Sequence, residues 1–282
     1  MLIKVGASEI YCYTGGRRFE PGQPTAVFIH GVLGDHSVWA LQSRYLANHC
    51  WNVLAIDLPG HCRSSGAPPA SVEQAAQCVS DLLDAARVSQ AALIGHSWGS
   101  LIALEAAARL QTRITHLVLV GTAYPMKVSP GLLAASLAQP QNAIRTINTF
   151  SRSTLAPPPS SLGPGTWVWG LSMALNRRVL KSNPGTNLFH TGFQACDRYG
   201  NGEKAIAQIT CPVLFVLGSM DAMTQAKSAQ TLIEGAKNAG KQVLVSRLPV
   251  GHYQMSEAPE QSLAAIREFL QKPAAALAKL AQ

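Results

Sequence analysis

Short apolar runs alternate with stretches of helical periodicity through the first 120 residues and again after residue 211. Runs at 2–5 and 10–13 predict an opening hairpin, and later runs of this kind are followed by helices. Strands this apolar, interleaved with helices, are typical of a parallel sheet covered on both faces. The remaining predicted strands are 26–30, 52–56, 91–95, 114–120, 212–217 and 242–248. The predicted helices are 38–49, 71–86 with Ser71 as its cap, 98–110, 224–238 and 259–271.

The pattern is interrupted after Gly121. Residues 122–207 are irregular, without convincing strands, and a Pro-rich stretch at 156–165 breaks any helix there. Because strand and helix alternation resumes afterwards, we expect one α/β domain formed by residues 1–121 and 208–282, with 122–207 inserted as a helical cap. Residues 274–282 are expected to form a short helix or a frayed tail.

The strongest chemical signal is Gly95-His96-Ser97-Trp98-Gly99, a G-x-S-x-G sequence between a predicted strand and a predicted helix. In that context the motif holds a serine on a tight, strained turn, with glycine two positions either side because a side chain there would collide. The serine hydroxyl would lie at a helix N-terminus, where the helix dipole favours developing negative charge. The alternative, without a catalytic role, is a glycine-rich turn at a helix cap.

Two further loops extend this pattern into a family resemblance. His30-Gly31-Val32-Leu33-Gly34 is similar to an HGxxG loop after the third strand, and Asp57-Leu58-Pro59-Gly60-His61 to a D-x-P-G-x loop after the fourth. With the serine motif, they make nearly the whole chain resemble the α/β-hydrolase superfamily. The resemblance implies a mostly parallel eight-stranded sheet with helices on both faces and a catalytic order Ser…Asp…His. Cys62 departs from the glycine usual in relatives.

The resemblance directs the choice of a base and an acid. Of eight histidines, only His252 follows the last predicted strand, whereas His30 and His96 occupy motif positions that usually structure loops. The acid in relatives follows the strand after the cap, which points to Asp221, or the strand before it, which offers no carboxylate here. We therefore expect Ser97, His252 and Asp221 as nucleophile, base and orienting acid.

The same resemblance supplies an oxyanion hole. The backbone N–H of Trp98, directly after the nucleophile, is one expected donor, and that of Val32, next to Gly31, is the other by analogy. A serine nucleophile argues against dehalogenases and many epoxide hydrolases, which use aspartate.

Composition fits a large folded core, because 47% of the 282 residues are hydrophobic and 13% charged. The chain opens without a signal-peptide pattern and has no apolar run near the roughly 18 residues of a membrane span, so a cytoplasmic location is expected. The six cysteines are scattered and are expected to be free thiols, most of them buried. Cys62, in a loop near the expected site, is a candidate for reactivity.

Charge adds one weak indication. The net charge is +8, but no basic run exceeds two residues and no nucleic-acid motif occurs, so a solvated basic surface is expected instead of a nucleic-acid partner. Residues 122–207 contain eight basic and two acidic side chains. This segment therefore carries most of the net positive charge of the chain. A basic cap weakly suggests an anionic substrate, but a solvated face is the favoured explanation.

The substrate itself is less constrained. We expect a small-molecule carboxylic ester with a small or medium acyl chain, hydrolysed without a cofactor or metal, by a monomer or dimer. The same triad serves carbon–carbon hydrolases, lyases and thioesterases, and a slow-turnover ligand sensor is a further alternative. Aromatic residues of the insertion either line the pocket or form the insertion's own core: Phe150, Trp167, Trp169, Phe189 and Phe193.

Overall fold

A computed structural model describes residues 1–153 and 168–271 of this chain. Its centre is one eight-stranded sheet in the order β1-β2-β4-β3-β5-β6-β7-β8. β1 and β2 pair antiparallel, β2 joins β4 antiparallel, and all later pairs are parallel. The predicted mostly parallel sheet is therefore confirmed. The strands are β1 (Leu2–Val5), β2 (Ser8–Tyr13), β3 (Thr25–Ile29), β4 (Asn52–Ile56), β5 (Ala91–His96), β6 (Ile114–Val120), β7 (Val213–Gly218) and β8 (Val243–Leu248).

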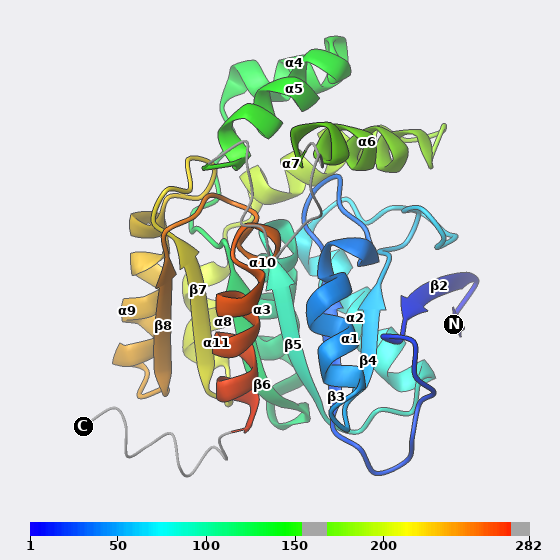
Figure 1. The fold of residues 1–282 in the computed structure, drawn as a ribbon, viewed down its shortest axis with the longest axis vertical. Coiled ribbons are helices and arrows are strands. Elements are labelled where there is room, and N and C mark those ends of the chain that lie inside the picture. The colour runs from blue at the N-terminus through cyan, green and yellow to red at the C-terminus, as the bar shows by residue number, and fades with distance from the viewer. Residues whose placement is uncertain (154–167, 272–282) are drawn as a thin grey trace.

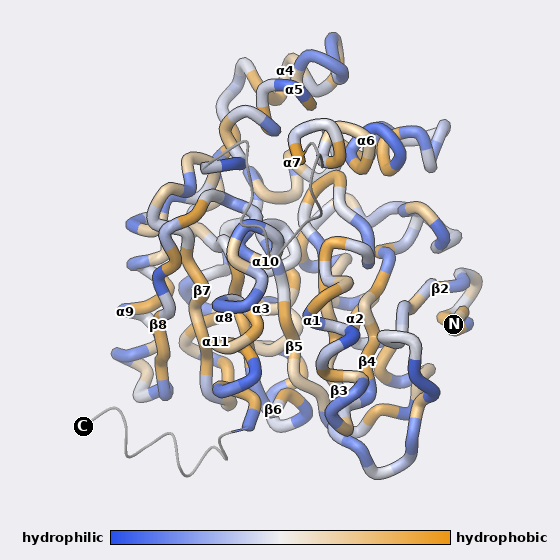
Figure 2. The backbone as a smooth tube through the Cα atoms, viewed as in Figure 1, coloured by the Kyte–Doolittle hydropathy of each residue, from blue (hydrophilic) through white to orange (hydrophobic). Residues whose placement is uncertain are grey.

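Helices cover both faces of the sheet (Figure 1). Two separate apolar clusters, one on each face, hold the layers together, and hydrophobic residues run along the central strands (Figure 2). One face carries α2 (Val72–Ala85), α3 (Trp98–Leu110), α8 (Gly202–Gln208) and α9 (Gln230–Asn238). The other carries α1 (Ala40–Ala47), α10 (Gln254–Glu257) and α11 (Pro259–Gln271).

Helix α2 shows how the local sequence produces these layers. The Ser71 hydroxyl accepts from the Gln74 amide at 3.2 Å, which satisfies one of the unpaired N–H groups of the first turn. Its buried residues follow a three-and-four spacing, so one apolar stripe faces the sheet. They are Val72, Ala75, Ala76, Val79, Leu82 and Leu83.

Of the five helices described between β6 and β7, the first four lie at the carboxyl ends of the parallel strands (Figure 1). They are α4 (Pro130–Ala138), α5 (Pro140–Ser151), α6 (Val168–Lys181) and α7 (Leu188–Arg198). These helices share an apolar cluster of their own, which includes Ile144 and Phe189. The cluster also takes in Leu33, and the Asn176 side chain donates to the Leu33 carbonyl at 3.0 Å. The four helices are thereby fixed to the loop that follows β3.

One predicted helix begins later than expected. Residues 224–238 were predicted to be helical, but a 3-10 turn at Ala226–Ala229 precedes α9, which begins at Gln230. The reason is local, because the Thr224 amide and hydroxyl are both bonded to the Asp221 carboxylate. The predictions for 156–165, Trp167 and 274–282 lie outside the described residues. No helix among the described residues is long and apolar enough to cross a bilayer.

Candidate active site

Ser97 stands on the sharp turn between β5 and α3. Its backbone has φ 54° and ψ −121°, a conformation that non-glycine residues rarely adopt. A Cβ on Gly95 would lie 2.0 Å from the Gly99 carbonyl oxygen, and one on Gly99 would lie 2.4 Å from that of Ile29. Both flanking glycines are thus required by contact with backbone, which cannot move aside. The turn leaves the half-buried Ser97 at the N-terminus of a 13-residue helix.

His252 and Asp221 come from the loops after the two neighbouring strands β8 and β7. His252 Nδ1 lies 2.9 Å from Asp221 Oδ2, and both side chains are buried. The His252 amide donates to the Ser151 carbonyl at 2.7 Å, which ties the loop to the end of α5. Ser97 and His252 line the same two cavities.

Asp221 is held as an anion. Burial alone would raise its pKa, but the adjacent His252 and the hydrogen bonds from Thr224 outweigh burial and lower the pKa to about 2. Its Oδ1 accepts from the amides of Met223 and Thr224, both at 2.8 Å. The carboxylate is therefore ionised at neutral pH and is able to orient the Nδ1–H of His252.

Two residues around this pair were not singled out from the sequence. The buried Thr224 hydroxyl lies 2.8 Å from Asp221 Oδ2, 2.9 Å from the Gly121 carbonyl and 3.0 Å from His252 Nδ1. Gln254 Nε2 lies 3.4 Å from the same Asp221 oxygen. The only signal in the sequence is their closeness to Asp221 and His252, which many loop residues share.

Replacing Thr224 tests whether its hydroxyl positions the acid and the histidine. Thr224→Val is expected to lower kcat by about 10-fold with little change in KM, because an unsupported carboxylate costs roughly 1–2 kcal/mol of orientation. Thr224→Ser, which keeps the hydroxyl, is the matched control and should restore most of the rate. Steady-state kinetics of both variants decide it. Equal losses in Val and Ser would mean that packing at this position matters in general, and not the hydrogen bond in particular.

His30 and His96 have structural contacts. His30 Nδ1 lies 2.9 Å from the Gly31 carbonyl while its Nε2 accepts from the Leu58 amide at 3.1 Å, so the ring joins the loops after β3 and β4. His96 Nε2 lies 2.8 Å from the His252 carbonyl. Burial, and then the nearby His252, lower the pKa of His96 to about 3. A neutral ring at that position supports the His252 backbone and adds no charge beside the His252 ring.

The loop after β3 lies directly against Ser97. A Cβ on Gly31 would lie 3.0 Å from the Ser97 Cβ, and the Gly34 amide closes a turn by donating to the Gly31 carbonyl at 3.0 Å. Among the described residues, no acceptor is found for the amide of Val32 or that of Trp98. Both amides therefore remain the expected donors to an oxygen bound near Ser97.

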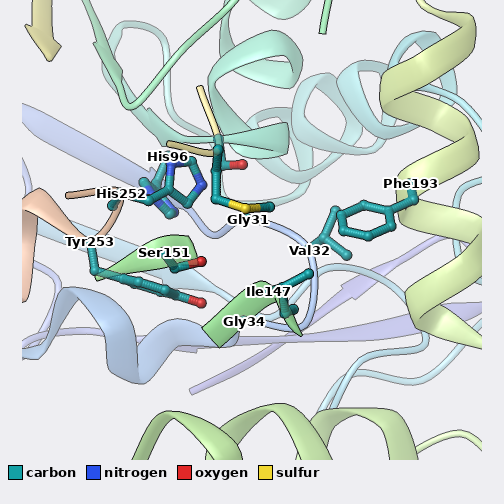
Figure 3. A pocket seen from close by; sticks show the side chains of 11 residues that line it. Gly31, Val32, Gly34, His96, Ile147, Ser151, Phe193, His252 and Tyr253 are labelled. Atoms are coloured by element: carbon teal, nitrogen blue, oxygen red, sulfur yellow. The ribbon is translucent and has the colours of Figure 1, made fainter. Parts of the chain in front are cut away.

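Two cavities of very different size meet at Ser97. The smaller holds about 30 Å³ and lies between the loop after β3, α5 and the loop after β8 (Figure 3). The larger holds about 320 Å³ and extends between α4, α7 and the loop after β7. Residues shared by both are Val32, Ser97, Phe193, Met223 and His252.

The aromatic residues of the insertion divide between the two expected roles. Phe150 lines the larger cavity, Phe189 is fully buried in the insertion's apolar cluster, and Trp169 packs against that cluster. Phe193 does both, because it is buried in the cluster and lines the cavity. The basic residues are mostly elsewhere. Lys127 is the basic residue that lines the larger cavity within the described part of the chain, and its ammonium donates to the Asp197 carbonyl at 2.6 Å.

Asp57 and Cys62 lie in the loop after β4. Asp57 Oδ1 accepts from the His36 amide and lies 2.8 Å from His36 Nδ1. Cys62 has φ 45°, the left-handed conformation that glycine would adopt freely, and burial followed by the charge of Asp35 raises its pKa to about 12. The thiol is therefore protonated and not activated. All six cysteines are free, as expected. Only three are buried, Cys12, Cys196 and Cys211, so the expectation that most are buried is wrong.

Within residues 1–153 and 168–271, one group of side chains has the spacing of metal ligands. The ligand atoms of Asp35, His36 and Asp57 lie within 4.8 Å of one another. Each is already engaged, because Asp35 pairs with Arg178 and accepts from the Ser37 amide, and His36 contacts Asp57. These contacts explain the grouping as loop structure that also connects α6 to the core.

Comparison with known proteins places this arrangement in context. A family model described as alpha/beta hydrolase fold matches residues 24–259. A protein from Mycoplasma pneumoniae that is named as an esterase or lipase is 25% identical over 256 residues, which is 86% of this chain and 88% of that protein. A pimeloyl-[acyl-carrier protein] methyl ester esterase from Neisseria meningitidis is 28% identical over 194 residues, covering 64% of this chain and 57% of that enzyme.

Solved structures extend the likeness of fold. The enol-lactonase from Burkholderia xenovorans LB400 superposes with a TM-score of 0.81 over 96% of this chain and 100% of that chain, at 19% identity. At that identity the likeness concerns the fold alone. Some curated relatives match over a short region only, and this chain spans about a quarter of their length.

Proposed function

This chain belongs to the alpha/beta hydrolase fold family, and we propose that it is a serine hydrolase that cleaves a carboxylic ester through an acyl-enzyme on Ser97. The observation that carries the proposal is the pair of His252 Nδ1 and Asp221 Oδ2 at 2.9 Å, on loops beside the strained turn that presents Ser97 to the same cavities. The relatives named as esterases support the ester as substrate class.

The proposed mechanism assigns one step to each group. His252 Nε2 takes the proton of the Ser97 hydroxyl as the oxygen attacks the ester carbonyl. The carbonyl oxygen, now negative, accepts from the Val32 and Trp98 amides. His252 returns the proton to the leaving alcohol, and then activates the water that hydrolyses the acyl-enzyme. Asp221 stabilises the imidazolium without accepting its proton.

We further propose that α4 to α7 cap this site, within the inserted residues 122–207. Phe193 of α7 and Ile147 of α5 both line a cavity that contains Ser97. A substrate must therefore reach the serine past these helices. The contact between Asn176 and the Leu33 carbonyl supports a cap that is docked on the loop carrying Val32.

Hydrolysis of simple esters tests the function. Acid release from methyl esters from acetate to decanoate and from alkyl acetates, followed in a pH-stat, detects every ester without a bulky chromophore. We expect turnover on at least one series, with an optimum at small or medium chain length. Absence of turnover on all esters, with thioesters or carbon–carbon substrates cleaved, would move the activity to another bond on the same triad. No turnover on any of them would favour a ligand sensor.

A further inference from the structure

The unequal cavities on either side of Ser97 constrain the shape of the substrate. A carbonyl attacked by Ser97 carries three groups, and its oxygen is directed to the amides of Val32 and Trp98. Its two remaining substituents must then enter the two cavities that meet at Ser97, of about 30 Å³ and about 320 Å³. One substituent is therefore small and the other large.

The smaller cavity has little capacity to expand. Ile147, Ser151 and His96 in its wall are buried at 6%, 3% and 3% exposure. The ring of Tyr253 is covered by the Arg152 guanidinium at 4.5 Å, and the Ser151 carbonyl accepts from the His252 amide. Its volume suffices for roughly two water-sized groups, so a methyl group fits and a butyl chain does not. Figure 3 shows Ile147, Ser151 and Tyr253 around this space.

The larger cavity suits an extended apolar chain. Its lining is mostly aliphatic, aromatic and sulfur-containing side chains, and it opens beside the exposed Phe150. The apolar residues that line it include Met126, Val128, Leu132, Phe150, Phe193 and Met223.

The two cavities differ in which half of an ester they suit. After the alcohol leaves, its place must be taken by the water that His252 activates. His252 lines both cavities, so their size decides between them. The smaller cavity, which His96 and Ser151 also line, has room for little more than such a water, whereas the larger one has the volume for a chain. We infer that the substrate is a medium-chain acyl ester of a small alcohol such as methanol, with the alcohol in the smaller cavity and Ile147 as the residue that limits its size. This inference rests on the proposed function.

Three isomeric esters of identical composition separate shape from hydrophobicity: methyl octanoate, butyl pentanoate and heptyl acetate. The wild-type enzyme is expected to cleave methyl octanoate at least about 10-fold faster, in kcat/KM, than either isomer, because each methylene that a pocket cannot accept costs a factor of about 10 or more. Heptyl acetate cleaved as fast as methyl octanoate would overturn the assignment of the alcohol to the smaller cavity. Equal rates on all three would overturn the inference and leave the esterase proposal intact, whereas no hydrolysis of any ester would remove both.

A pair of variants on α5 tests the size limit. Ile147→Ala enlarges the smaller cavity and should raise the ratio of butyl pentanoate to methyl octanoate hydrolysis by about 10-fold. Ile144→Ala is the matched control, since Ile144 is buried in the same helix and cluster but does not line either cavity. It should leave the ratio unchanged. An equal shift in both variants, or no shift in Ile147→Ala at unchanged Tm, would contradict the role of Ile147. If Ile147→Ala does not fold, the wild-type isomer ratios still decide the substrate shape.

Discussion

Ser97→Ala is expected to lower kcat for ester hydrolysis by on the order of 10⁶, leaving a rate close to background, because no other group supplies the covalent step. The change removes one hydroxyl from a half-buried side chain, so the fold should be retained. Alanine keeps the Cβ of serine, so the strained backbone of the turn should also be retained. Its φ of 54° is set by the strand and helix on either side. Rates in the pH-stat and the Tm of both proteins provide the measurement.

Ser129→Ala is a matched control for this variant. Ser129 also lines the larger cavity, where it caps α4 by accepting from the Leu132 amide. Its loss should cost about 1 kcal/mol of stability and change kcat by no more than a few-fold. Turnover in Ser97→Ala at a tenth of the wild-type rate or more would show that another residue, or a bound water alone, carries the reaction.

Asp221→Asn is expected to reduce kcat by on the order of 10⁴. Asp221 Oδ2 lies 2.9 Å from His252 Nδ1, and in the proposed mechanism this contact fixes the tautomer that leaves a lone pair on Nε2 for the Ser97 proton. An amide nitrogen in that position would donate to Nδ1, so that Nε2 carries the proton and is unable to act as a base. KM should change little, since Asp221 is buried behind His252 and does not line either cavity.

Asp197→Asn, on α7 of the proposed cap, controls for the loss of a negative charge. Asp197 accepts from the Val128 amide at 3.1 Å, and it lies outside the His252 hydrogen bonds. The kcat of Asp197→Asn should remain within a few-fold of the wild-type value. Wild-type turnover in Asp221→Asn, or a comparable loss in both variants, would mean that the orienting acid lies elsewhere.

The sequence predicted most of the sheet because each strand is an apolar run bounded by loops and helices. It failed at the start of α9, where Thr224 bonds Asp221 and keeps residues 224–229 out of the helix. The Thr224 hydroxyl also lies 2.9 Å from the Gly121 carbonyl and 3.0 Å from His252 Nδ1, and helical periodicity does not reveal these tertiary contacts. Local pattern is a guide to structure only where tertiary contacts do not oppose it.

Some residues of the candidate site could be predicted from the sequence, and others could not. Ser97 is visible in the sequence because its turn needs Gly95 and Gly99, and these glycines are explained by backbone contacts of 2.0 and 2.4 Å. Thr224 and Gln254 are not visible, since a hydroxyl or amide beside an acid has no distinctive spacing. The cavity sizes were also beyond prediction. Phe193 lines both cavities while Phe189, four residues earlier on the same helix, is buried in the cluster beside them.

Covalent labelling with a fluorophosphonate tests the central claim most directly, because it reports the activated nucleophile without requiring the right ester. Intact-mass spectrometry of the wild-type protein should show a single adduct, and peptide mapping should locate it on Ser97. The adduct should be absent in Ser97→Ala and should form at least about 100-fold more slowly in His252→Ala. An adduct on another residue, or labelling at an undiminished rate in His252→Ala, would contradict the assignment of Ser97 and His252 as nucleophile and base.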